Sequence, residues 1–476
     1  MSNLSDLLPA GAGGKQVDFV ATGTLASGQA VALKTDGTVT SISSDVPTTV
    51  FSDQGGSSVN NINGYFDVTQ NKIFVSYANA STSKCDGVVG TVSSDGSITF
   101  GTAAQISSKT NSGVSNVSVY STTDQKGVVI ITDSSSYRLY AYVITISGTS
   151  FSVGTEVEVG DTNGKVIKAE GKTPLVYCSN NSKFLLTYRD LGNSNYGTAI
   201  AGNISGTSTT WGTKHTIISN LATFFTAAFI ASGNPGAKTG VIFNNSASGN
   251  LNYVIMTVDN SLGITQGSID TFKDVNTNNF YCAYDSTSAR FISVVKNEIN
   301  ASSLAGTTLT KGAYITLGSV DSVTAAVTYN SNLNRSVVFI YGFVYNVSVS
   351  GTTCTLESTS TAPQSNVQLT QPILGSPSNV SVFLYRDNVN DTDGTALAYV
   401  PNAITSSSFI GITDAAISSA ASGSVTIKGG ISSNVSSLTP NSNYYVQTNG
   451  TLSTTTSTVL AGRALSSTSI NLDYTT

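Results

Sequence analysis

The chain has 476 residues, of which 10% are charged and 39% are hydrophobic, and its formal net charge at pH 7 is −5. Few charges combined with many aromatic residues exclude a typical disordered chain, and the mildly acidic balance does not favour a nucleic-acid-binding surface. The four cysteines and the single histidine are too widely spaced for a disulfide framework or a metal site, so neither a metal nor a cofactor is expected.

The N-terminal part lacks the basic start and the apolar core of a signal peptide. Residues 17–58 read as the first part of a small β-domain. Within them, the alternation in QAVALK and the turn TDGT predict a hairpin inside residues 18–42. The longest apolar stretch, at residues 224–231, is too short to span a membrane, which favours a soluble protein made in a cytosol.

A basic residue precedes a short apolar run six times in the middle of the chain. The runs are KIFVSY, KGVVII, KFLLTY, KTGVIF, RFISVV and RSVVFI, and the cations are Lys72, Lys126, Lys183, Lys238, Arg290 and Arg335. The intervals are 54, 57, 55, 52 and 45 residues, and NVSVFLY from Asn379 fits as a seventh unit without the cation. Because one unit does without it, the cation is interpreted as architecture rather than as part of a repeated binding site.

Each unit reads as four short strands. An extended run precedes the cation, the apolar run follows it, and the last strand follows a Gly-bearing turn such as SISGTSFSVG from Ser147. Four-stranded units at this period predict a β-propeller of about seven blades over residues 59–403. The continuous apolarity of the run after the cation predicts an inner strand that is buried on both faces. An array of β-sandwiches is the competing fold, but it does not predict such an even unit length.

The last segment, residues 404–476, departs from this repeat. It contains FIGITDAAISSAASGSVTIKGG and LTPNSNYYVQTNGTLSTT, in which short strands alternate with Gly, Asn and Pro turns. Together with GTLASGQAVALKTDGTV near the N-terminus, these stretches resemble a small β-domain of virion fibre and appendage proteins of tailed phages, cyanophages included. The resemblance covers only the two ends of the chain.

In such proteins the two parts of the small domain usually lie close together in the sequence, whereas here the repeats separate them. The resemblance therefore implies an all-β chain in which a propeller is inserted into a loop of the small domain. It also implies that residues 1–16, which include NLSDLLPAGAGG, are a leader that anchors the protein to a particle. It implies no catalytic residue.

Three residues are candidates for surface contact: Trp211, Arg189 and Arg386. Both arginines lie in the sequence YRD just after an inner strand, a pattern that would place two Arg–Asp pairs on one face of the propeller. The alternative is a pair of strand-end ion pairs that contribute little energy. Trp211 has a side chain that can stack on a sugar ring, and its alternative role is packing within a strand.

Catalytic patterns are weak throughout. The acidic residues that paired-carboxylate glycosidases need lie mostly in turns, where Asp caps its own backbone, at Asp36, Asp95, Asp124, Asp285 and Asp414. The stretch NVNDTDG at residues 388–394 has the oxygen spacing of a calcium loop but lacks the closing Glu, which favours a solvated hairpin loop. His215 has no GxSxG nucleophile to serve.

The resemblance implies a structural protein of a bacteriophage virion, of the tail-fibre or baseplate-appendage type, and made in the host cytoplasm. Other virion proteins are the expected partners of the leader and the small domain, which also provide self-association, with a trimer expected. The propeller loops are expected to bind a host-surface glycan or protein without turnover. Nucleic acid and membrane insertion are not expected. The alternatives are a capsid decoration or head-fibre protein and, from another class, a propeller glycan depolymerase.

Overall fold

The computed structural model describes residues 15–34, 36–42, 46–52, 59–93, 96–111, 116–160, 164–165, 173–231, 237–318, 325–362, 367–373, 380–389, 392–400, 406–447, 450–457 and 459–472. All regular structure in these ranges is β, apart from one short 3-10 turn at Ser406–Ser408. The prediction of an all-β chain is therefore confirmed. The predicted leader lies almost wholly outside the described residues.

The chain divides into two compact units. The flanking unit combines Met1–Asp45 with Val400–Thr476, and the propeller unit is Val46–Tyr399. The first boundary falls before the predicted residue 59, because β4 (Thr48–Ser52) forms its hydrogen bonds with β36 (Asp393–Tyr399). Residues 46–52 therefore belong to the propeller unit, although the sequence analysis assigned them to the small domain.

The flanking unit contains two five-stranded sheets, and the first interleaves strands from both ends of the chain. Its order is β1-β38-β37-β2-β3, so β1 pairs with β38 and β2 pairs with β37. The predicted hairpin is β2–β3, where the Asp36 carboxylate accepts a hydrogen bond from the Thr38 backbone N–H at 3.0 Å. The second sheet has the order β39-β43-β42-β40-β41. The strands are β1 (Gln16–Val20), β2 (Ala30–Leu33), β3 (Val39–Ser41), β37 (Phe409–Thr413), β38 (Ser422–Ile427), β39 (Ile431–Ser432), β40 (Asn443–Val446), β41 (Leu452–Ser453), β42 (Leu460–Ala464) and β43 (Ile470–Asn471).

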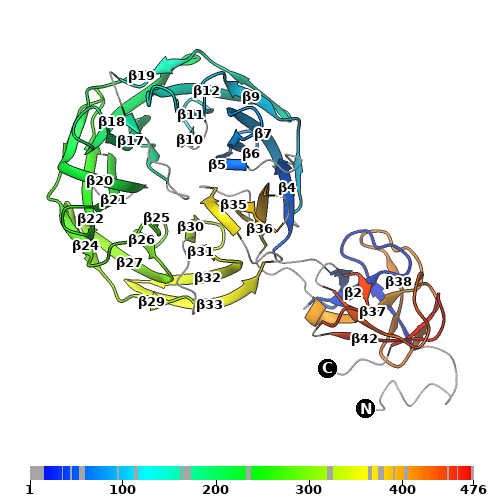
Figure 1. Cartoon of the computed structure of the whole chain (residues 1–476). Coiled ribbons are helices and arrows are strands. Elements are labelled where there is room, and N and C mark those ends of the chain that lie inside the picture. The colour runs from blue at the N-terminus through cyan, green and yellow to red at the C-terminus, as the bar shows by residue number, and fades with distance from the viewer. Residues whose placement is uncertain are drawn as a thin grey trace. The chain divides into compact units, whose positions relative to one another are not determined.

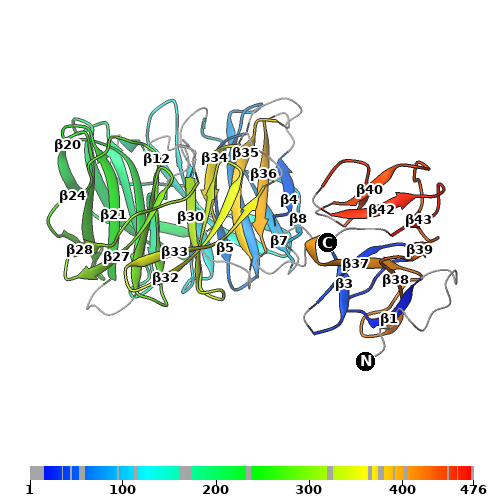
Figure 2. The same ribbon diagram turned by 90° about the horizontal axis from the view of Figure 1, so that it is seen from below.

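The propeller unit is a ring of antiparallel sheets around a central axis, the arrangement of a β-propeller (Figure 1). Figure 2 shows the same strands from the side. The first two sheets are β5 (Val59–Asp67), β6 (Lys72–Asn79), β7 (Lys84–Val92), β8 (Ile98–Phe100) and β9 (Ala104–Ser107), and then β10 (Asn116–Ser121), β11 (Lys126–Thr132), β12 (Leu139–Ser147), β13 (Ser150–Val153) and β14 (Val157–Glu158).

The next sheet has ten strands, because one long strand, β20, joins two consecutive repeats. The beginning of β20 pairs with β18, and its end pairs with β21. The strands of this sheet are β15 (Gly164–Lys165), β16 (Leu175–Cys178), β17 (Lys183–Asp190), β18 (Tyr196–Ser205), β19 (Ser208–Trp211), β20 (His215–Ile230), β21 (Ala237–Asn245), β22 (Asn250–Val258), β23 (Ile264–Gln266) and β24 (Asp270–Lys273).

Three more sheets complete the ring, and the last one takes its outer strand from the N-terminal side of the chain. The strands are β25 (Phe280–Asp285), β26 (Arg290–Val295), β27 (Glu298–Ala305), β28 (Thr308–Lys311) and β29 (Ile315–Thr316); β30 (Ala325–Asn330), β31 (Arg335–Ile340), β32 (Phe343–Ser350) and β33 (Thr353–Thr361); and β34 (Val367–Pro372), β35 (Ser381–Asp387) and β36 with β4. Pairing of β4 with β36 joins the beginning of this unit to its end.

The repeated cations mark strand starts, as the sequence analysis predicted. Five of them are the first residue of their strand, and Lys238 is the second residue of β21. The apolar run that follows each cation is buried; β11, for example, is covered from Gly127 to Thr132. The core lies between neighbouring sheets, where side chains such as Val294, Val338 and Phe383 come from three successive sheets.

Three of these cations also connect neighbouring sheets. The Lys126 Nζ donates to the Gly206 carbonyl at 2.7 Å, Lys238 Nζ to that of Gly306 at 2.8 Å, and Arg290 Nε to that of Gly351 at 2.8 Å. Each glycine lies in the turn between the third and fourth strands of the next repeat. The cation therefore holds one sheet to the next, which supports its interpretation as architecture.

Candidate functional site

An aromatic side chain occupies the same register position on six successive inner strands. Each one lies opposite the residue that follows the repeated cation; Tyr120, for instance, pairs with Gly127, and Tyr284 pairs with Phe291. We call this set the aromatic collar, and its members are Phe66, Tyr120, Tyr177, Phe229, Tyr284 and Tyr329.

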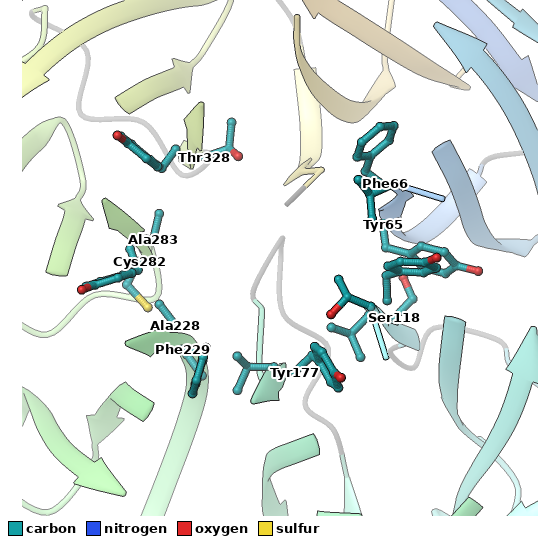
Figure 3. A pocket seen from close by; sticks show the side chains of 18 of the residues that line it. Tyr65, Phe66, Ser118, Tyr177, Ala228, Phe229, Cys282, Ala283 and Thr328 are labelled. Carbon is teal, nitrogen blue, oxygen red and sulfur yellow. The ribbon is translucent and has the colours of Figure 1, made fainter. Parts of the chain in front are cut away.

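The collar surrounds a cavity of about 470 Å³ on the inner side of the ring (Figure 3). All six collar residues line this cavity, and small side chains such as Ala228 and Ala283 form the wall between them. Such a volume lies within the range of small-molecule sites, roughly 300–1,000 Å³. The inner strands converge here because every repeat begins at the centre of the ring, so equivalent residues of different repeats face one space.

Hydroxyl groups fix the collar from one repeat to the next. The Tyr120 hydroxyl donates to Thr69 Oγ1 at 2.8 Å, the Tyr177 hydroxyl to Thr123 Oγ1 at 2.7 Å, and that of Tyr329 to Thr287 Oγ1 at 2.6 Å. In each pair the threonine belongs to the first turn of the preceding repeat, three residues before its cation. These bonds hold the aromatic rings in place and leave a row of exposed threonine hydroxyls at the rim.

The described residues of the cavity wall are uncharged. None of its described lining residues carries an ionisable acid or base that is charged at neutral pH. Burial raises the pKa of the Cys282 thiol to about 12, against a lesser opposing effect of its Thr226 hydrogen bond, and burial likewise raises the pKa of Tyr120 to about 12. Both groups are therefore neutral at physiological pH, and neither is poised as a nucleophile.

The carboxylates closest in sequence to the collar have structural partners. Asp67 follows Phe66, and its Oδ1 accepts the backbone N–H groups of Thr69 and Gln70, both at 2.9 Å. Asp285 follows Tyr284 and accepts the backbone N–H groups of Thr287 and Ser288 in the same way. The predicted role of Asp285 as a turn cap is confirmed, and neither carboxylate is arranged for acid–base chemistry.

Two other turn aspartates differ from the prediction. Asp414 accepts hydrogen bonds from the side chains of Ser424 and Thr426 on the neighbouring strand, at 2.8 and 2.6 Å. Asp124 accepts the Ser121 hydroxyl at 2.6 Å. In both places a nearby hydroxyl competes successfully with the backbone for the carboxylate. Asp95 lies outside the described residues.

The three candidate contact residues from the sequence do not line the collar cavity. Trp211 lies on β19, half-buried, where its ring covers Gly202 and its Nε1 donates to Thr209 Oγ1 at 2.9 Å. This geometry favours packing, the alternative that the sequence analysis kept open for Trp211. A tryptophan held against its own sheet presents only part of its ring to solvent.

The predicted pair of Arg189 with Asp190 does not form among the described residues. Asp190 is bridged by Lys214 at 3.0 Å rather than by Arg189, whose pKa is lowered by burial. Arg386 donates to the side-chain oxygens of Asn388 and Asn60, at 3.1 and 2.9 Å, and of Gln368. Because Asn60 lies on the first sheet and Arg386 on the last, this guanidinium connects the two ends of the ring.

Two sequence candidates remain, His215 and the NVNDTDG loop. His215 has a hydrogen-bonding partner, and part of the loop lies outside the described residues. His215 Nε2 lies 3.0 Å from Gln266 Oε1, so the imidazole has a hydrogen-bonding partner on β23. Residues 390–391 of the NVNDTDG loop lie outside the described part of the chain. Within that part, no cluster of three or more His, Cys, Asp or Glu side chains has an arrangement that could hold a metal ion.

Sequence reasoning missed the collar, although its signal was present. In YSTTDQK, YCSNNSK, YDSTSAR and YNSNLNR, a tyrosine stands six residues before the cation. The repeated cation indicates the start of a strand, whereas the tyrosine by itself indicates only a buried strand residue. Its importance depends on the ring, because only closure of the propeller brings equivalent inner strands around one space.

Comparisons with known proteins identify no family for this chain. No protein-family model matches it, and no curated protein sequence does. Similar solved structures include a protein from Lactobacillus plantarum (10% identity, 78% of this chain and 99% of that one, TM-score 0.43) and an oligogalacturonate lyase from Vibrio parahaemolyticus (9%, 83% and 100%, TM-score 0.41). A functionally unknown protein from Desulfotomaculum acetoxidans is similar at 10% identity, covering 70% and 90%, with a TM-score of 0.42. Likeness at this level assigns no activity to this chain.

Proposed function

We propose that this chain is a structural protein of a tailed-phage particle, of the tail-fibre or baseplate-appendage type. The flanking unit attaches the protein to other virion proteins, and the propeller unit binds the host surface. In this proposal the ten-stranded sheet comprises two blades that are joined through β20, so the propeller has seven blades.

One observation carries this proposal. Two of the stretches that resemble phage fibre proteins come from opposite ends of the chain, and they form one sheet in which Ala30 pairs with Ile412 and Val31 pairs with Gly411. Leu25 and Ile417 form a further bridge between the two stretches. The two halves therefore make a single domain, as the resemblance implies, and the propeller unit is an insertion within it.

A binding role fits the chemistry better than turnover. Glycoside hydrolysis needs two carboxyl groups on either side of the scissile bond. The described lining of the collar cavity contains none, and the nearby Asp67 and Asp285 hold turns. A rigid ring of sheets with a preformed cavity is suited to recognition.

A glycan depolymerase is the alternative from another class, and an assay separates it from binding. Host capsular polysaccharide is incubated with the purified chain, and reducing ends are counted over time. The binding proposal expects no release above the level of a heat-denatured control. Steady release that scales with protein concentration would establish turnover instead.

Particle location is tested by immunogold labelling of intact phage together with mass spectrometry of purified particles. The proposal expects gold at the tail or its baseplate. Gold on the head would support the capsid decoration or head-fibre alternative. A chain that never co-purifies with particles would exclude the virion role. Crosslinking of the purified protein tests self-association, with a trimer through the flanking unit expected.

A further inference from the structure

The aromatic collar combines three properties that together restrict its ligand. Its walls are aromatic and aliphatic, its rim carries hydroxyl groups, and its described lining has no charge. We propose that the collar cavity binds an uncharged saccharide, which enters by its terminal pyranose ring. This inference rests on the proposed role in host-surface binding and names the class of ligand.

The absence of charge disfavours an ionic ligand. A carboxylate or phosphate that enters this cavity loses hydration and meets no described cation in the wall to replace it. Two of the cations nearest in sequence are engaged with the next repeat: Lys126 donates to Gly206, and Arg290 donates to Gly351. An acidic sugar is therefore a poorer ligand than its neutral counterpart.

The aromatic walls suit the flat apolar faces of a sugar ring. Phe229, Tyr284 and Tyr329 are half-buried, so part of each ring remains open to the cavity, whereas Phe66, Tyr120 and Tyr177 are more than nine-tenths covered. Aromatic rings supply large contact areas while losing little conformational freedom. The hydrogen bonds between repeats fix several of these rings before any ligand arrives, which reduces the entropy lost on binding.

The rim distinguishes a sugar from a purely apolar molecule. Each Tyr–Thr pair places two hydroxyl groups side by side, and the threonine of each pair is exposed. Three such pairs, at Thr69, Thr123 and Thr287, follow the rim. An occupant with an apolar ring and peripheral hydroxyl groups uses the walls and the rim together.

The experiment measures binding of the full chain by isothermal titration calorimetry and saturation-transfer NMR. The probes are uncharged methyl hexopyranosides and the matching methyl hexopyranosiduronates, in which a carboxylate replaces the hydroxymethyl group. Cyclohexylmethanol serves as an apolar ring. We expect at least one neutral glycoside to bind at least about tenfold more tightly than its uronate and than cyclohexylmethanol. Equal or tighter binding of the uronate or of cyclohexylmethanol would overturn the inference, as would binding of no probe.

Variants locate the site. Phe229→Ala and Tyr284→Ala each remove a ring face and should weaken binding by at least about tenfold, whereas Tyr329→Phe removes one rim hydroxyl and should weaken it about threefold. Tyr341→Asn, in an exposed turn that does not line the cavity, and Trp211→Ala are the controls and should bind as the parent does. Circular dichroism and thermal unfolding confirm that each variant is folded. If folded collar variants bind as the parent does, or if only Trp211→Ala loses binding, the sugar site is not the collar.

The two proposals can fail separately. Neutral-sugar binding by a chain that is absent from particles would support the collar site and exclude the virion role. A chain found on particles that binds none of the probes would support the virion role and exclude the sugar site.

Discussion

The propeller unit and the flanking unit are both built from antiparallel sheets, but they depend on distant chain segments to different degrees. In the propeller unit most sheets consist of consecutive strands, and among its described strands only β4 is brought from elsewhere to close the ring. In the flanking unit the order β1-β38-β37-β2-β3 places two strands from the C-terminal segment between strands from the N-terminal segment. Repetition therefore distributes the stability of the propeller unit, whereas the flanking unit requires the two ends to meet.

The hydrophobic cores of the two units also differ, in the size of their buried side chains. The largest fully buried side chains among the described residues are Tyr and Phe, and all of them lie in the propeller unit, from Tyr65 to Tyr385. The flanking core consists mainly of Ala, Val, Ile and Leu, with Phe409 and Tyr444 as its buried aromatic residues. The flanking unit therefore buries less apolar area, so a local disruption removes a larger share of its stability.

The largest effect is expected where the two ends of the chain touch. Gly28 has φ +72°, and a Cβ placed there would lie 1.9 Å from the backbone oxygen of Asn434. Gly28→Ala should destabilise the flanking unit by more than about 4 kcal/mol and leave the propeller unit folded. Calorimetry with hydrogen-exchange mass spectrometry reports the two units separately.

Gly23→Ala is the matched control for Gly28→Ala. Gly23 also has a positive φ, +88°, but a Cβ there would meet no atom within 4 Å. Only the backbone conformation is unfavourable, at about 1–2 kcal/mol. Equal effects of the two substitutions would show that contact between the ends is not what limits the flanking unit.

Removal of a large side chain from the propeller core should have a strong effect, but a more local one than Gly28→Ala has in the flanking unit. Phe339 is fully buried, and its ring centroid lies 5.6 Å from that of Phe383 and 5.8 Å from that of Tyr385 on the next sheet. We expect Phe339→Ala to lower the free energy of unfolding of the propeller unit by about 3–5 kcal/mol. Urea unfolding measures the change, and Val389→Ala, at a side chain that is 63% exposed, should remain within about 0.5 kcal/mol.

Alkaline pH should weaken the propeller unit through its buried thiols. Burial raises the pKa of Cys85 and Cys282 from 9.0 to about 12. Below pH 9 each thiol is neutral in both states, and its contribution to stability is complete. Above pH 9 the unfolded thiol ionises first, so stability falls as the pH rises toward 12, by up to about 1.4 kcal/mol per pH unit for each group.

Urea unfolding between pH 7 and pH 10.5 measures this slope. A Cys282→Val variant should show a shallower decline than the parent, because it has one thiol fewer to ionise on unfolding. An unchanged slope would mean that this thiol does not couple folding to pH. The folded parent should also resist thiol reagents at pH 8 until urea is added.

The smallest effect is expected at a single cation of the repeat. Lys126 loses only its hydrogen bond to Gly206 when it becomes Met, and this bond is exposed. Lys126→Met should reduce stability by about 0.5–1 kcal/mol, and Lys126→Arg should retain most of the contact. A loss as large as that of Phe339→Ala would contradict the view that repetition distributes the stability of the ring.

Much of this architecture could be predicted because local patterns repeat. The cations at Lys72, Lys183 and Arg335 identified the start of the second strand, since continuous apolar runs after a polar turn are buried strands. The place of β4 could not be predicted in this way. Its residues Thr48–Ser52 pair with β36, and no local pattern specifies a partner that lies at the other end of the ring.

The candidate site was less predictable than the fold. Arg189, Arg386 and Trp211 were selected for what their side chains can do, but the structure uses Arg386 to join the ring and Trp211 to cover its sheet. Isolated residue types indicate chemistry only when their neighbours are known. Tyr120 and Tyr284 acquire a common environment only through ring closure.

The amino-acid sequence by itself determined the β-class, the repeat and the start of each buried run, because these depend on apolar patterns and turns within one unit. It also contained the two related end segments of the flanking unit. Only the tertiary structure decided that the ends interleave in one sheet, that β4 closes the ring, and that six aromatic residues share a cavity. Those features depend on contacts between residues far apart in the chain, which a local pattern does not specify.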